Sequence, residues 1–254
     1  MAAPLPGLVT GESEPMSAEV RIRLVRHGET GSNVAGLLDT AAPGADLTEL
    51  GHAQARGLVH RLADDPVDVL VASPLARTRQ TAGPLATARG LALTLDERLR
   101  EISAGDLEMR GDAVAMRTYL GTVLAWVSGD LDARVPGGES GTEVYARFDA
   151  ALDEIVLSGA RDVVVVSHGA MIRSWCAVRA GVPFSVFATN PVPNTGLVGL
   201  AGLPGAWRVT SWVDRTVAEL ASEGATSGVT PSSITPDLAV HGRRPVRYGD
   251  EDPK

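Results

Sequence analysis

The segment Asp162–Ser167, with the sequence DVVVVS, most limits what this chain can fold into. Its four consecutive valines show no alternation with polar residues, which is typical of a central parallel strand covered by helices on both faces. The run leads into Ser167-His168-Gly169, where a helix is expected to begin. The segment Val20–Asn33 repeats this order, because an apolar run leads into Arg26-His27-Gly28. Two strands that each end in a histidine and a glycine predict an α/β fold.

Other segments fit the same alternation of strands and helices. Strands are expected near 67–72, 91–95, 196–200 and 207–212, and helices are expected after Thr48, Pro74 and Ser140 and over 116–127. Thr48 and the pair Ser140 and Glu143 are suitable helix caps. This order predicts a doubly wound α/β domain with a mostly parallel sheet and helices on both faces.

Composition and periodicity divide the chain into three parts. Residues 1–19 are expected to be a flexible lead without apolar periodicity, residues 20–220 the one folded domain, and residues 221–254 a disordered tail. The 254 residues are 44% hydrophobic and 21% charged, which suits one globular domain with loose ends.

Charge and motifs exclude several classes of function. A net charge of −8 argues against a broad nucleic-acid or anionic-membrane surface. The chain has no signal-like start and no long apolar segment, so we expect a cytoplasmic protein. Cys176, the single cysteine, is expected in the core. The sequence has no P-loop, no GxGxxG turn and no HExxH helix, which argues against nucleotide-loop enzymes, dinucleotide dehydrogenases and the commonest zinc proteases. Since no spaced cluster of Cys, His and carboxylate residues is apparent either, we expect neither a metal nor another cofactor. Oligomeric state is left open.

Several polar residues should meet at one edge of the sheet. Arg26 and His27 follow one expected strand, Ser73 follows another, and His168 follows the valine strand. Ligands of open α/β sheets gather at the carboxyl ends of the strands. Arg77 would lie near the amino end of a helix, where backbone N–H groups also attract anions. Because guanidinium groups match phosphate oxygens, this cluster predicts a site for a small phosphorylated ligand.

Six blocks of sequence carry a resemblance to a known family. In chain order they are RHGETGSN (Arg26–Asn33), LTELGHAQA (Leu47–Ala55), SPLARTRQTA (Ser73–Ala82), LREISAGDLEMRG (Leu99–Gly111), PGGES (Pro136–Ser140) and VVVVSHG (Val163–Gly169). Together they resemble the histidine phosphatase superfamily, the phosphoglycerate-mutase-like group, over about Val20 to Trp212.

The resemblance implies a role for each matching residue. His27 would be the nucleophile that accepts the phosphoryl group, and Glu101 matches the proton donor. The residues that would hold the phosphate oxygens are Arg26, Asn33, Arg77 and His168. Such cationic donors can stabilise the transition state without a metal, and a carboxylic acid can protonate the leaving alkoxide. Three further acids lie close to Glu101 in the sequence and leave its role less certain: Glu97, Asp106 and Glu108.

The function expected from this resemblance is a metal-independent phosphomonoesterase that acts through a phosphohistidine intermediate. A phosphoglycerate mutase and a non-catalytic phosphoester-binding module are the alternatives. The chain departs from the family's commoner pattern at Leu107, where many members have tryptophan, and at the apolar stretch Leu37–Asp46. Members differ in substrate at both places, so the substrate is left open.

Overall fold

The computed structural model describes residues 19–227, and these residues contain a sheet of six strands in the order β3-β2-β4-β1-β5-β6. The strands are β1 Val20–Arg26, β2 Val69–Ala72, β3 Leu93–Leu95, β4 Asp162–Ser167, β5 Leu197–Gly202 and β6 Arg208–Trp212. Neighbours among β3, β2, β4 and β1 are parallel, whereas β5 is antiparallel to both β1 and β6. The expected mostly parallel sheet is therefore confirmed.

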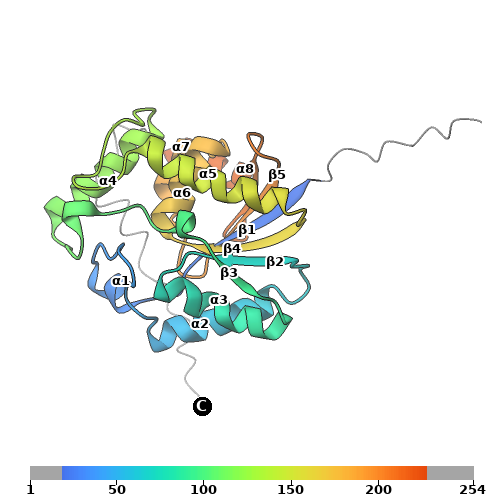
Figure 1. Cartoon of the computed structure of the whole chain (residues 1–254). Helices are drawn as coiled ribbons and strands as arrows, with labels where there is room; N and C mark the ends of the chain where they lie inside the picture. The colour runs from blue at the N-terminus through green and yellow to red at the C-terminus, as the bar shows by residue number, and fades with distance from the viewer. Residues whose placement is uncertain (1–18, 228–254) are drawn as a thin grey trace, which may run out of the picture.

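Helices cover both faces of this sheet (Figure 1). They are α1 Gly31–Ala35, α2 Glu49–Arg61, α3 Ala76–Arg89, α4 Ala113–Val127, α5 Gly141–Leu157, α6 Gly169–Arg179, α7 Phe184–Thr189 and α8 Val217–Ser227, with 3₁₀ turns at Glu97–Leu99 and Gly105–Leu107. α2 and α3 lie on one face, and α4 to α8 lie on the other.

Strand β4 is at the centre of this arrangement, and all six of its residues are buried. Val163 and Val165 pack into the core beneath α4 to α8, whereas Val164 and Val166 pack against α2 and α3. Successive side chains of a strand point to opposite faces. A run of four valines therefore supplies apolar groups to two cores at once.

The expected helix caps are present. The Thr48 hydroxyl accepts from the Gly51 N–H at 3.0 Å, and Ser140 forms a reciprocal capping box with Glu143. A second capping box, which the sequence reading missed, joins Thr30 and Asn33 at the start of α1. In residues 19–227 no helix is both long and apolar enough to cross a membrane.

The predicted boundary at residue 221 is wrong, because α8 continues to Ser227. Val217, Leu220 and Ala221 recur at helical spacing; Leu220 is buried and the other two pack against the same core. This apolar stripe is too short to stand out against the polar residues around it. The remainder of the predicted tail, and the predicted lead apart from Glu19, lie outside the described residues.

Candidate active site

The ends of three parallel strands meet where the sequence predicted. In the sheet, Arg26 of β1 is level with Ser167 of β4, and the last residue of β2 is level with Val166. The residues that follow these strands are therefore neighbours. The rings of His27 and His168 lie edge to face with centroids 5.3 Å apart.

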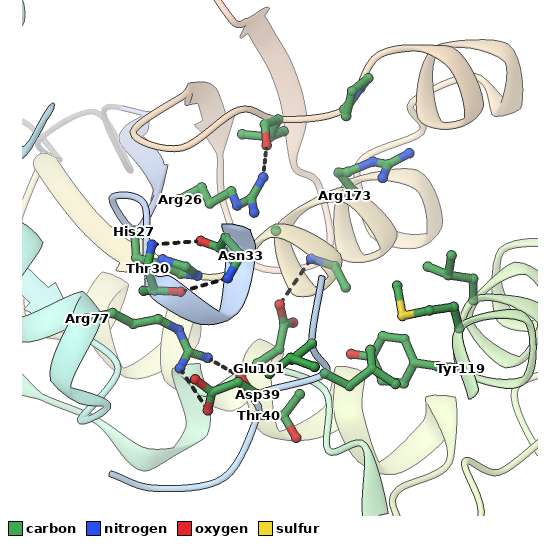
Figure 2. A pocket seen from close by; sticks show the side chains of 18 residues that line it. Arg26, His27, Thr30, Asn33, Asp39, Thr40, Arg77, Glu101, Tyr119 and Arg173 are labelled. Carbon is green, nitrogen blue, oxygen red and sulfur yellow. Dashed lines mark hydrogen bonds and ion pairs between the residues drawn. The ribbon is translucent and has the colours of Figure 1, made fainter. Parts of the chain in front are cut away.

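A pocket of about 210 Å³ opens at this edge (Figure 2). Its polar lining residues are Arg26, His27, Thr30, Asn33, Asp39, Thr40, Arg77, Glu101, Tyr119 and Arg173. Leucine, methionine, proline and valine side chains form much of the rest, from the loop after α1, from α4 and from the loop after α7. Tyr119 of α4 belongs both to the core and to this lining, so α4 contributes to both.

His27 is held in one tautomer. Its Nδ1 lies 2.7 Å from the Gly28 carbonyl oxygen. Because a carbonyl can only accept a hydrogen bond, the ring proton is on Nδ1, and Nε2 carries the lone pair. Burial, followed by the charges of Arg77 and Arg26, holds the pKa of His27 well below its usual value. The imidazole is therefore neutral and nucleophilic at Nε2.

His168 is also buried and neutral. Arg77 Nη2 donates to its Nδ1 at 3.2 Å, so the ring proton is on Nε2, which lies 2.8 Å from the Ser73 hydroxyl. Burial, with the nearby charge of Arg77 next, lowers the pKa of His168 well below the ordinary value. Arg77 Nη2 also donates to the Asp39 carbonyl at 3.0 Å, while Nη1 lacks a hydrogen-bond partner within residues 19–227.

Arg26 and Asn33 also have donors that the fold does not use. Arg26 Nη1 donates to the Val192 carbonyl at 2.8 Å, whereas its buried Nε has no partner in the part of the chain that the structure describes. The Asn33 side-chain oxygen accepts from the Thr30 N–H at 3.2 Å and from Asn194 Nδ2 at 3.1 Å. With its oxygen engaged twice, Asn33 has its amide N–H groups for an anion.

Glu101 brings a carboxyl group to the same pocket. Its Oε1 accepts from the Ile102 and Met171 N–H groups at 3.0 and 2.9 Å, and Oε2 accepts from the Ala170 N–H at 3.3 Å. The last two donors belong to the first turn of α6. The amino end of a helix favours an acidic group, so α6 positions this side chain.

The other acids near Glu101 are directed elsewhere. Glu108 accepts from the Thr40 and Ala41 N–H groups at 2.7 and 3.0 Å and holds that loop in place. The Glu97 side chain is 71% exposed. Among the four candidate acids, all of which lie within the described residues, Glu101 alone lines the pocket.

Sequence reasoning missed several residues of the site. Ser73, which contacts His168, was already part of the cluster expected at the sheet edge. The residues that were not expected, and that contact the predicted set or line the pocket, are Asp39, Asn194, Tyr119 and Arg173. Arg173 had a usable signal, because it lies four residues after Gly169 on the same helical face. Asp39 and Asn194 lie in loops, where no periodic pattern marks them.

Comparison with known proteins points to one family. The model of the histidine phosphatase superfamily (branch 1) matches residues 22–215. The chain is 32% identical over 203 residues to the Yersinia pestis protein named "Probable phosphoglycerate mutase GpmB", covering 80% of this chain and 94% of that protein. It is 34% identical over 209 residues to a PE-PGRS family protein of Mycobacterium tuberculosis, covering 75% of this chain but only 36% of that relative.

Two groups of solved structures are similar. A mycobacterial glucosyl-3-phosphoglycerate phosphatase in complex with VO3 superposes with a TM-score of 0.65 at 30% identity, covering 76% of this chain and 98% of that one. The alpha-ribazole phosphatase of Shigella flexneri superposes with a TM-score of 0.63 at 26% identity, covering 78% and 98%. Both neighbours are phosphatases by name.

Proposed function

Because the chain belongs to the histidine phosphatase superfamily, we propose that it is a metal-independent phosphomonoesterase acting through a phosphohistidine intermediate. One observation carries the proposal. His27 is a buried, neutral imidazole whose Nδ1 proton is held by a backbone carbonyl, so that Nε2 keeps its lone pair beside two arginines with unused donors. The substrate is a small phosphorylated molecule that fits a pocket of about 210 Å³.

In the first step, His27 Nε2 attacks phosphorus and the bond to the ester oxygen breaks. The transferring group spreads negative charge over its oxygens, and the free donors of Arg26, Arg77 and Asn33 stabilise that charge. Glu101, protonated at this stage, gives its proton to the leaving alkoxide. The products of the step are the alcohol, phosphohistidine and a Glu101 carboxylate.

In the second step, the Glu101 carboxylate takes a proton from water, whose oxygen attacks phosphorus. The bond from phosphorus to Nε2 breaks, inorganic phosphate leaves, and His27 and the protonated Glu101 are restored. The same group thus serves as acid and then as base, as microscopic reversibility requires.

His168 contributes through its second tautomer. A phosphate oxygen can replace Arg77 at Nδ1 only if Nδ1 carries the proton. The Ser73 hydroxyl allows this exchange, because it can donate to Nε2 as readily as it accepts from it. His168 then donates to the phosphate, and Arg77 is free to do the same.

Phosphoglycerate mutase is a second candidate, favoured by the similarity to GpmB over 94% of that protein. A mutase returns the phosphoryl group to an acceptor alcohol, whereas a phosphatase gives it to water. A non-catalytic binding module is less well supported, because binding alone needs no carboxyl group at Glu101. Product analysis with 3-phosphoglycerate separates the first two: a phosphatase releases inorganic phosphate, and a mutase releases 2-phosphoglycerate.

The decisive experiment traps the intermediate. Wild-type protein mixed with a ³²P-labelled phosphomonoester and quenched in denaturant should carry label that is stable in base and lost in acid. His27→Ala should lose both the label and turnover while keeping a cooperative thermal transition, because His27 follows a strand and lies outside the apolar clusters. Full labelling of His27→Ala would remove His27 from the mechanism.

A further inference from the structure

Arg173 is a cation of the pocket that the steps above do not use. It projects from α6, and its Nη2 donates to the Phe187 carbonyl at 2.5 Å while its guanidinium lies 5.0 Å from the Phe187 ring centroid. Its Nε is buried without a hydrogen-bond partner, and no ion pair within residues 19–227 includes Arg173. A partly buried charge without a counter-ion is costly, so the surroundings of Arg173 favour an anionic group of a ligand.

The helix places Arg173 next to the phosphate site but outside it. Gly169 begins α6 and packs on Arg26, since a Cβ there would lie 3.1 Å from Arg26 Nε. Arg173 follows on the same face after four residues, or roughly 6 Å of helical rise. Figure 2 shows it beyond Arg26, on the side of the pocket away from His27 and Arg77.

The positive charges of the pocket favour a ligand that has a second anionic group besides its phosphate. Burial, with the charge of Arg26 as the second cause, lowers the pKa of Arg173 to about 10. The guanidinium is still charged at neutral pH. Glu101 forms no ion pair with Arg173 within residues 19–227, and its two oxygens accept from the backbone N–H groups of Ile102, Ala170 and Met171 instead. The cost of two neighbouring cations falls if the bound ligand has negative charge at both ends.

We propose that Arg173 binds a carboxylate of the substrate, so that the preferred substrates are small phosphomonoesters bearing a carboxylate a few bonds from the ester oxygen. This inference rests on the phosphomonoesterase function proposed above. A single guanidinium that already donates to the Phe187 carbonyl suits a monoanion with two oxygens. A second phosphate would require the larger donor set that surrounds His27.

A matched pair of ligands tests the carboxylate. 3-Phosphoglycerate and glycerol 3-phosphate differ mainly in a carboxylate in place of a hydroxymethyl group. Their dissociation constants are measured by calorimetry on the His27→Ala background, so that turnover does not interfere. A charge-assisted hydrogen bond contributes enough free energy for about a tenfold or greater preference for 3-phosphoglycerate.

Variants at Arg173 then separate recognition from structure. When Arg173→Gln is added to the His27→Ala background, the ratio of the two dissociation constants should fall to about one, while the dissociation constant of glycerol 3-phosphate should change by no more than about twofold. Arg173→Lys should retain part of the preference for 3-phosphoglycerate. Arg179→Gln is the control, because Arg179 lies on the same helix, faces the Tyr145 ring and bonds Asp149 outside the pocket. It should leave the preference intact.

Several outcomes would overturn the assignment. One is that the dissociation constants of glycerol 3-phosphate and 3-phosphoglycerate are nearly equal while Arg173 is still present. Another is an equal increase in the dissociation constants of both ligands in Arg173→Gln, which would make Arg173 a structural link between α6 and α7. If Arg173→Gln does not fold, the same comparison of the two dissociation constants is made with Arg173→Lys. A preference for fructose 1,6-bisphosphate over fructose 6-phosphate, without one for 3-phosphoglycerate, would assign a second phosphate instead. Absence of phosphoenzyme in wild-type protein would reject the proposed function, and a persistent binding preference would still identify the carboxylate subsite.

Discussion

At the scale of single residues, the site depends on two neutral histidines among cations. His27 and His168 are buried, and this burial, followed by the charge of Arg77, lowers the pKa of both. In the proposed mechanism, the cations that bind the phosphate therefore also help to keep His27, the proposed nucleophile, unprotonated. Each histidine also has its tautomer set by one neighbour, the Gly28 carbonyl for His27 and Arg77 for His168.

This arrangement predicts a loss of stability in mild acid. In the unfolded chain both histidines titrate near the ordinary value of about 6.5, whereas in the fold their pKa values are well below it. Below pH 6.5 the unfolded chain therefore binds more protons than the folded one. The free energy of unfolding should fall as pH drops, by up to about 1.4 kcal/mol per pH unit for each histidine.

Urea denaturation at pH 7.5 and pH 5.5 measures the difference. In His27→Gln the free energy of unfolding should fall less between pH 7.5 and pH 5.5, because the variant lacks one of the two groups that gain a proton on unfolding. His52→Gln, which removes an exposed histidine from α2, is the control. An unchanged pH dependence in His27→Gln would show that His27 is not held neutral by the fold.

The role of Glu101 is tested by the quality of the leaving group. If it is the general acid, Glu101→Gln should slow the phosphorylation burst with glycerol 3-phosphate by about 10²–10⁴-fold. The burst with p-nitrophenyl phosphate should fall much less, because p-nitrophenolate is a weak base and leaves almost unaided. Glu97→Gln, a change at an exposed acid four residues earlier, should alter neither burst. Equal losses on the two substrates would contradict the acid role.

At the scale of elements, helix α5 holds the segment that carries Glu101. Arg147 of α5 donates to the carbonyls of Arg98, Arg100 and Glu101 at 2.7, 2.9 and 3.0 Å, and its Nε lies 2.7 Å from Glu139. The acid is thus fixed from both sides, by these backbone contacts and by the first turn of α6.

Arg147→Gln should therefore loosen the acid as well as weaken the fold. The variant loses three hydrogen bonds to backbone carbonyls and the short ion pair with the largely buried Glu139, whose remaining ion pair, with Arg100, is 3.6 Å long. The free energy of unfolding should therefore fall by about 3 kcal/mol. Turnover of glycerol 3-phosphate should fall through kcat more than through KM. Arg134→Gln breaks an exposed pair with Glu143 near the start of the same helix and should change stability far less. Similar melting temperatures for both variants would contradict this account.

At the scale of the whole molecule, a protein with a net charge of −8 concentrates positive charge in one pocket. Three arginines and the neutral His27 line it, and the neutral His168 lies behind them against His27. In a chain of opposite overall charge, such a pocket attracts a small anion without making the surface adhesive to nucleic acid.

The charge in this pocket predicts activity without a metal ion. Arginine donors can supply the stabilisation that a divalent cation supplies elsewhere. Phosphatase activity should therefore be unchanged after dialysis against EDTA. Within residues 19–227 no group of three or more His, Cys, Asp or Glu side chains is placed to hold a metal ion. Loss of activity in EDTA, with recovery on adding Mg²⁺ or Zn²⁺, would contradict this prediction.

The sequence alone determined the sheet and the centre of the site. Four valines in a row need apolar cover on both faces, so β4 had to be central. Residues that follow parallel strands share one edge, so His27 and His168 had to be neighbours. These inferences succeed because they depend on strand geometry, which local sequence encodes.

Only the tertiary structure showed which acid lines the pocket and that the Ser73 hydroxyl contacts His168. It also showed that Arg173 has no counter-ion in the described chain, and it placed the end of α8 at Ser227. Glu97, Glu101, Asp106 and Glu108 are equally polar in the sequence, and their separation depends on how the 98–108 segment packs against α5 and α6. Loop paths and partner distances arise from contacts between residues far apart in the chain. No local pattern records them, and the pocket exists only once the packing is complete.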